Sequence, residues 1–171
     1  MTAPITIEDY DPRWPGKFET LRSRIARVLD VLVTAIEHIG STAVPGLAAK
    51  PIIDIDILLR SAGDFPLVRA RLATLGYEHE GDQGIAGREV FRIPPGEISH
   101  HLYVCLPDSQ EYVRHIAFRN YLRLHQEEAS AYAVLKRQLA RKFAIDREAY
   151  TQAKTDFVRQ ILLRSGQDAT S

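Results

Sequence analysis

The sequence has little sulfur and no excess of charge of either sign. Its 171 residues include one cysteine and one methionine, and 22 lysines and arginines balance 22 aspartates and glutamates. The single cysteine, Cys105, cannot form an intramolecular disulfide, which favours a reducing compartment and a place in the core. Balanced charge provides no global field that would hold nucleic acid or an anionic membrane. Any charged ligand must therefore be bound locally.

Long hydrophobic runs are also missing. The longest, Pro51–Leu59, is interrupted by two aspartates and is too short to span a bilayer. Residues 1–10 lack the basic start and the apolar stretch of a secretory signal. We therefore expect a cytoplasmic protein without a membrane partner. The patterns do not indicate its oligomeric state, because apolar stripes can close the core of a monomer or the interface of a dimer.

Hydrophobic spacing divides the chain into a mixed half and a helical half. Residues 1–107 combine helical spacing with short β-branched runs, whereas residues 108–171 show helical spacing alone. We expect helices over 15–32, 64–75, 108–125, 127–142 and 146–162, and strands at Thr34–Ile39, Pro51–Leu59, around Tyr77, Glu89–Ile93 and His100–Leu106. At the start of the second half, Asp108 followed by Glu111 is typical of a capping box.

This order of elements predicts one α/β (α+β) domain over residues 1–171. A mixed β-sheet packed with helices is expected in 1–107, a helical cap in 108–165 and a flexible tail in 166–171. The first half carries 11 basic and 14 acidic side chains, and the second carries 11 and 8. Since their net charges are opposite, we expect the two halves to face each other.

Two aspartates lie on one face of an apolar strand. Between residues 52 and 58, the period of two directs alternate isoleucines to one face and Asp54 and Asp56 to the other. Carboxylates about 7 Å apart repel each other unless a cation or a basic group lies between them. Mg²⁺ takes one or two such ligands and completes its shell with water and phosphate oxygens. The pair therefore indicates either a solvated strand face or a metal site that orients a phosphoryl group.

The dipeptide Gly40-Ser41 precedes this strand, in the loop that follows the previous one. Glycine allows a backbone to approach a phosphate closely, and Ser41 adds a hydroxyl donor beside the amides of the loop. Alone, the dipeptide is typical of a turn. Together with the aspartate pair, it indicates a site for a polyphosphate.

Several segments resemble the signature of the GrpB family, whose fold is similar to that of the polymerase β superfamily of nucleotidyltransferases. The longest is IEHIGSTAVPGLAAKPIIDID, residues 36–56. The likeness extends to residues 10–15 (YDPRWP), 100–104 (HHLYV), 114–123 (RHIAFRNYLR) and 146–150 (DREAY), and so covers nearly the whole chain. The resemblance implies a nucleotidyltransferase-like mixed sheet. It also implies that Gly40 and Ser41 contact a nucleoside triphosphate and that Asp54 and Asp56 hold Mg²⁺.

A third carboxylate, usual on a later strand of active nucleotidyltransferases, is not found here. On the corresponding strand, the face opposite the core carries His101 and Tyr103. His101 would be a general base or a softer metal ligand that admits Mn²⁺ or Zn²⁺, unless it is only a hydrogen-bonding strand residue. Glu89 and Glu97 are alternative sources of the missing acid, and no spacing favours either.

Basic groups are needed as well, because a triphosphate with one divalent cation keeps excess negative charge. Lys50 lies on the loop side of the aspartates, and Arg119 and Arg123 share one face of a helix. These three side chains are the predicted phosphate contacts. The alternative is that they are solvated surface charges.

Three functions agree with these patterns. The first is a metal-dependent nucleotidyltransferase that transfers a nucleotidyl group from a nucleoside triphosphate to an unknown hydroxyl acceptor, with Asp54, Asp56 and His101 as catalytic residues and Mg²⁺ or Mn²⁺ as cofactor. The second is a non-catalytic module that binds a nucleotide or a CoA-type molecule. The third is a metal-dependent phosphoesterase that uses His101. The nucleobase and the acceptor are not indicated.

Overall fold

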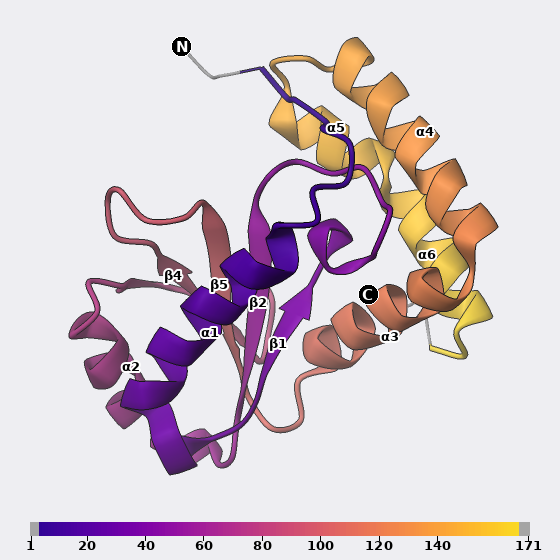
Figure 1. Cartoon of the computed structure of the whole chain (residues 1–171). Coiled ribbons are helices and arrows are strands. Elements are labelled where there is room, and N and C mark those ends of the chain that lie inside the picture. The colour runs from indigo at the N-terminus through magenta and orange to yellow at the C-terminus, as the bar shows by residue number, and fades with distance from the viewer. Residues whose placement is uncertain (1–3, 168–171) are drawn as a thin grey trace.

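The computed structural model describes residues 4–167, and its centre is a five-stranded mixed β-sheet (Figure 1). The strands lie in the order β1 (Val33–Ile39), β2 (Ile53–Leu59), β5 (His100–Cys105), β4 (Arg88–Arg92) and β3 (Glu78–Gly81). β2 and β5 run parallel, and the other neighbouring pairs are antiparallel. The prediction of a mixed sheet is confirmed, and the strand that carries the aspartate pair lies between β1 and β5.

Strand β2 buries one face, as its alternating sequence predicts. Its three alternate isoleucines are at most 1% exposed and share one core with helices α1 (Trp14–Leu29) and α2 (Phe65–Ala73). Burial of one such side chain stabilises the fold by about 1.5–3 kcal/mol. A shift of one residue would turn all three isoleucines to the other face, so their burial fixes the register. Asp54 and Asp56 must therefore point away from this core.

Four further helices gather at the other side of the sheet, to the right in Figure 1. They are α3 (Gln110–Leu124), α4 (Gln126–Lys142), α5 (Arg147–Ala153) and α6 (Thr155–Arg164). Leu122 of α3 belongs to a second core that also contains Val44 and Leu47 from the loop after β1. The helices therefore hold the loop that begins with Gly40 and Ser41.

Two predictions about the helices were wrong, one about the continuity of a helix and one about a helix cap. The helix expected over 146–162 is interrupted at Lys154, where the backbone N–H bonds to the carbonyl of Thr151, three residues back, at 3.2 Å. This tighter turn separates α5 from α6, and neither glycine nor proline marks it in the sequence. At the start of α3, the cap is Ser109 and not Asp108, because the Ser109 hydroxyl accepts the hydrogen bond from the N–H of Tyr112 at 3.2 Å.

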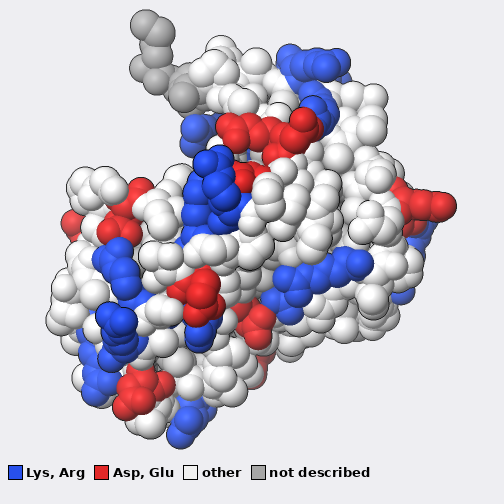
Figure 2. All heavy atoms as spheres, in the orientation of Figure 1, with Lys and Arg blue, Asp and Glu red and all other residues white. Residues whose placement is uncertain are grey.

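Charges of both signs are interspersed on the face of the molecule seen in Figure 2. Within residues 4–167, no helix has the length and apolar character needed to cross a membrane. Cys105 is fully buried, as expected for a core residue, and burial raises the pKa of its thiol to about 12. Most of the tail predicted at 166–171 lies outside the described residues.

Candidate functional site

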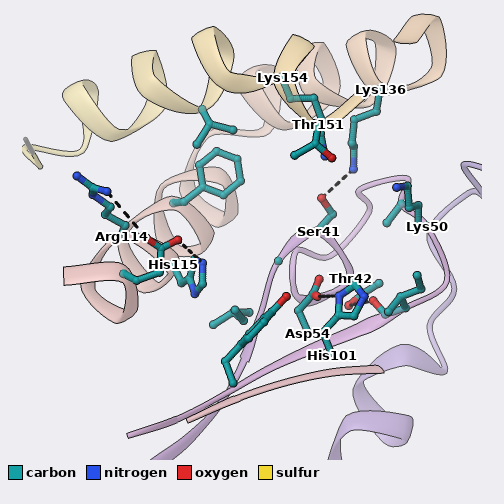
Figure 3. A pocket seen from close by; sticks show the side chains of 18 of the residues that line it. Ser41, Thr42, Lys50, Asp54, His101, Arg114, His115, Lys136, Thr151 and Lys154 are labelled. Atoms are coloured by element: carbon teal, nitrogen blue, oxygen red, sulfur yellow. Dashed lines mark hydrogen bonds and ion pairs between the residues drawn. The ribbon is translucent and has the colours of Figure 1, made fainter. Parts of the chain in front are cut away.

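A cavity of about 540 Å³ lies between the polar face of the sheet and the C-terminal helices (Figure 3). This volume is within the range of small-molecule sites. Five of the residues predicted for a nucleotide site line it, namely Gly40, Ser41, Lys50, Asp54 and His101. Helices α3 and α4 contribute Glu111, Arg114, His115 and Lys136, and the turn between α5 and α6 contributes Lys154. Lysines of the helical half thus face an aspartate of the sheet half, in agreement with the opposite net charges of the two halves.

Gly40 lies in close contact with the carboxylate of Asp54. Its φ is +71°, in the region that favours glycine, and a Cβ built on it would lie 2.4 Å from Asp54 Oδ2. No other residue type would leave space for the carboxylate in this position. The close approach seen at this glycine is made to a carboxylate of the protein itself, and the predicted approach to a phosphate stays a prediction.

His101 lies beside Asp54 on the neighbouring parallel strand. The two residues are register partners of β5 and β2, and His101 Nδ1 is 2.7 Å from Asp54 Oδ1. The hydrogen bond to the carboxylate raises the pKa of His101, although burial opposes it. The imidazole therefore lies on the face of β5 where the sequence predicts it, and the structure places it next to the first aspartate.

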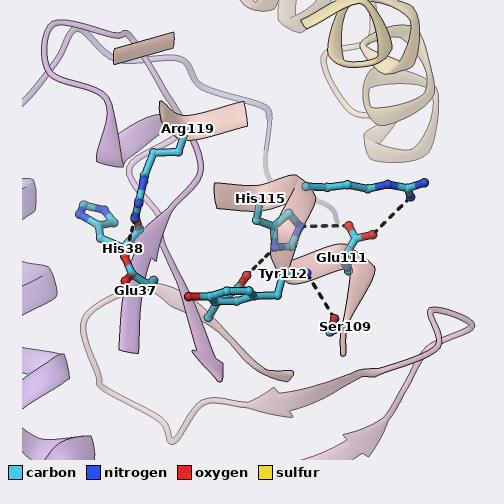
Figure 4. A network of polar contacts seen from close by, with 9 residues as sticks. Glu37, His38, Ser109, Glu111, Tyr112, His115 and Arg119 are labelled. Carbon is cyan, nitrogen blue, oxygen red and sulfur yellow. Dashed lines mark hydrogen bonds and ion pairs between the residues drawn. The ribbon is translucent and has the colours of Figure 1, made fainter. Parts of the chain in front are cut away.

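Asp56 is fully buried beneath a histidine from helix α3. His115 Nδ1 is 2.8 Å from Asp56 Oδ2, and His115 Nε2 is 3.0 Å from Glu111 Oε1, so one imidazole bridges two carboxylates (Figure 4). Burial would lower the pKa of His115, but the hydrogen bonds with Asp56 and Glu111 prevail and raise it to about 9. Burial in turn raises the pKa of Asp56, and the bond to His115 opposes that rise. The other oxygen of Asp56, Oδ1, is buried without a hydrogen-bond partner.

Three lysines form the basic end of the cavity. Lys136 is 3% exposed, and its ammonium donates to Ser41 Oγ at 2.8 Å and to the carbonyl of Ala48. Burial, reinforced by the charge of Lys154, lowers the pKa of Lys136 to about 7. Burial and the charge of Lys50 lower the pKa of Lys154 to about 8, and the pKa of Lys50 is lowered as well, mainly by burial. An anion between these lysines would favour their charged forms and oppose these shifts.

Arg119 and Arg123 do not reach this cavity. Arg119 Nη1 donates to Glu37 Oε2 at 2.6 Å and to the carbonyl of His38 at 2.9 Å, which places it against β1 (Figure 4). Arg123 Nε donates to the carbonyl of Ala43 at 2.8 Å. Both arginines therefore hold β1 and the loop that follows it. Their shared helical face was predicted correctly, but the sequence could not show that this face packs on β1.

The two acids considered as replacements for the third carboxylate lie elsewhere. Glu97 pairs with Arg24 at 2.7 Å, Glu89 pairs with His79 at 2.6 Å, and neither lines the cavity. The carboxylate that lines the cavity besides Asp54 is Glu111. Sequence reasoning missed Glu111 and His115, which lie four residues apart on one helical face. Their spacing was visible, but nothing in it connected them to Asp56, 59 residues from His115.

The aspartate pair suits a hard divalent cation. Both carboxylates lie on the same face of β2, Asp54 reaches the cavity, and the unpartnered Oδ1 of Asp56 is the kind of buried oxygen that a cation would satisfy. Within residues 4–167, no group of three or more histidine, cysteine, aspartate or glutamate side chains is arranged to hold a metal ion. Two carboxylates would therefore have to be supplemented by water and phosphate oxygens, a shell that Mg²⁺ accepts.

The fold is that of the nucleotidyltransferases related to polymerase β. Terminal uridylyl transferase 4 from Trypanosoma brucei, solved with bound dUTP, superposes with a TM-score of 0.56 at 14% identity over 94% of this chain and 59% of its own. The Cid1 poly(U) polymerase, solved as a mutant bound to MgATP, gives a TM-score of 0.56 at 14% identity over 87% of this chain and 50% of its own. Identities this low establish the fold alone.

The chain belongs to the GrpB family, whose model, described as GrpB protein, matches residues 4–164. The crystal structure of conserved protein GrpB from Enterococcus faecalis has a TM-score of 0.85 at 35% identity, over 94% of this chain and 96% of its own. A UPF0157 protein of Pseudomonas aeruginosa is 41% identical over 166 residues, 94% of this chain and 67% of that protein. UPF0157 protein YqkA of Bacillus subtilis is 36% identical over 150 residues, and the chain spans 44% of its length.

Proposed function

We propose that the protein is a metal-dependent nucleotidyltransferase that transfers a nucleotidyl group from a nucleoside triphosphate to a hydroxyl acceptor. The observation that carries the proposal is the arrangement of one cavity, in which Asp54 on the sheet faces Lys136 and Lys154 on the helices. A triphosphate placed between these walls would have its tail against ammonium groups and its α-phosphate beside the carboxylates. Two proteins of this fold have been solved with a bound nucleotide, which supports a nucleotide as the ligand class.

In this proposal, the role of each site residue follows from its position in the cavity. Lys50, Lys136 and Lys154 bind and neutralise the phosphates, and Ser41 adds a hydroxyl at the same end. Asp54 and Asp56 would hold the Mg²⁺ or Mn²⁺, which supplies charge neutralisation at the α-phosphate when it is bound. His101 orients the Asp54 carboxylate through their 2.7 Å contact. Catalysis would come mainly from positioning and from charge stabilisation.

Thermal unfolding with nucleotides tests the proposal. ATP, GTP, CTP and UTP are each added with and without Mg²⁺ or Mn²⁺ to the wild type, to Asp54→Asn and to Asp156→Asn, a control at a side chain that is 89% exposed. A ligand at one hundred times its Kd stabilises the folded state by about 2.7 kcal/mol. We expect metal-dependent stabilisation of the wild type and of the control, and none of Asp54→Asn. Equal stabilisation of all three proteins would contradict the proposal.

A non-catalytic nucleotide- or CoA-type binding module is the second candidate. The observation that favours it is His101, which stands on β5 where active nucleotidyltransferases usually carry the third carboxylate. Such a module would bind the metal and nucleotide through the same residues but would release no pyrophosphate with any acceptor. Pyrophosphate release measured beside the binding screen separates the two, and release of phosphate from simple esters would instead favour a phosphoesterase that uses His101.

A further inference from the structure

A second cavity adjoins the first. It has a volume of about 590 Å³ and lies between the loop from β3 to β4 and the start of α3. Glu111 and Arg114 line both cavities, so the two share a wall. In Figure 3, Arg114 and His115 lie at one end of the site and Lys136 and Lys154 at the other, and Asp54 lies on the sheet below the lysines.

The order of these groups matches the geometry of phosphoryl transfer. In such reactions the attacking oxygen and the leaving oxygen lie roughly in line on opposite sides of the phosphorus. If the lysines hold the phosphates that leave, the acceptor must approach from the far side of Asp54. The second cavity shares Glu111 and Arg114 with the first and contains none of the three lysines, so it is the candidate for that approach.

The lining of the second cavity indicates the chemistry of its ligand. Its walls are backbone of the loop 84–87 with the apolar side chains of Ile85 and Leu106. Its charged side chains are Asp108, Glu111 and Arg114, and the Arg114 guanidinium lies 3.9 Å from the Glu111 carboxylate. The net charge of the lining is therefore negative. A phosphate-bearing acceptor would be repelled, whereas an uncharged hydroxyl compound with some apolar surface would be accepted.

We propose that this second cavity is the acceptor site and that it binds a small, uncharged, partly apolar hydroxyl compound, with Glu111 receiving the proton of the reacting hydroxyl. The inference rests on the proposed nucleotidyl transfer. In the step, the acceptor O–H proton passes to the Glu111 carboxylate and the oxygen forms a bond to the α-phosphorus. The bond from that phosphorus to the bridging oxygen breaks, and pyrophosphate leaves with the electron pair.

The position of Glu111 suits this role. Its carboxylate is held by His115, which is itself held by the buried Asp56, so the group is fixed relative to the metal site. The hydrogen bond from His115, together with nearby arginines, lowers the pKa of Glu111, so the carboxylate is ionised at neutral pH. Glu111 would touch the acceptor as a catalytic residue, and His115 would act through it as a positioning residue.

Backbone amide signals of Gly84 and Gly87 in an ¹⁵N-labelled protein report binding in the second cavity. The probes are methyl glucoside and its 6-phosphate, which differ by the phosphate alone, each added at equal concentration with MgATP present. We expect methyl glucoside to shift both signals and its 6-phosphate to bind at least about tenfold more weakly. Ala86→Trp places an indole at the cavity from an exposed position and should abolish the shifts. Ala62→Trp, at an exposed alanine outside the cavity, is the matched control.

The outcomes separate this inference from the proposed function. If MgATP stabilises the protein but methyl glucoside shifts neither signal, the acceptor site is refuted and nucleotide binding stands. Equal or tighter binding of the 6-phosphate, or shifts that persist in Ala86→Trp, would also refute it. If none of ATP, GTP, CTP and UTP binds with Mg²⁺ or Mn²⁺, the nucleotidyltransferase proposal fails, and a glucoside shift would then mark a binding site without that reaction.

Discussion

Gly40→Ala tests whether the close contact between the loop after β1 and Asp54 requires a residue without a side chain. The new Cβ would lie 2.4 Å from Asp54 Oδ2, and the residue would have to adopt a φ of +71°. The left-handed backbone costs about 1–2 kcal/mol for a residue with a side chain. The clash adds to this cost, because Asp54 must turn away and weaken its hydrogen bond with His101. Since both partners are partly exposed, we expect this second contribution to be about 1 kcal/mol.

Gly46→Ala is the matched control for the backbone contribution. Its φ is +81°, and a Cβ built there would meet no atom within 4 Å. Urea unfolding should therefore show a smaller loss of unfolding free energy for Gly46→Ala than for Gly40→Ala. In an Asp54→Ala background, the cost of Gly40→Ala should fall, because the contact at 2.4 Å is removed. Equal costs for the two glycines, or no coupling with Asp54→Ala, would refute the reasoning.

The remaining predictions concern the polar network and the lysines. The pKa of His115 is raised to about 9, so its contribution to stability is complete below its ordinary pKa of 6.5 and is lost as pH rises through about 9. The unfolding free energy of the wild type should therefore decline between these pH values. The decline should be smaller in His115→Gln. Lys136→Met should weaken nucleotide binding by about 10- to 100-fold in calorimetry, because it replaces the ammonium by an apolar group of similar length. It should also cost about 1–3 kcal/mol of stability, because the Ser41 hydroxyl and the Ala48 carbonyl lose their donor, whereas exposed Lys142→Met should change neither. Glu111→Gln should leave nucleotide binding intact and slow transfer by at least about 100-fold, and unchanged turnover would exclude it as the base.

The sheet and one wall of the site could be predicted because they follow from local patterns. A period of two in a run of isoleucines determines which face of β2 is buried, and therefore where Asp54 and Asp56 point. The loop at Gly40 comes next to this strand because β1 and β2 are adjacent and antiparallel. His101 could be placed as well, since it lies on the strand paired with β2.

The helical wall could not be predicted in the same way. Lys136 reaches Ser41, which is 95 residues away in the chain, and a helical pattern does not state which of its charged faces meets a distant loop. Arg119 and Arg123 were chosen from the same kind of pattern, and they contact β1 and the following loop. To assign Glu111 and His115 to the site, one must know that α3 lies over β2. Whether the selected residues bind a nucleotide stays a prediction until it is measured.

The loop between β1 and β2 constrains how the protein can be shortened or recombined. It begins at Gly40, which lies against the carboxylate of Asp54, and continues through Val44 and Leu47, whose side chains lie in the core formed with α3, α4 and α6. A chain that stopped after β5 would expose these two side chains to water and leave the loop without support. The sheet therefore cannot be removed from its helices as a minimal version of the site, and an exchange of either part between relatives would have to preserve the packing of both.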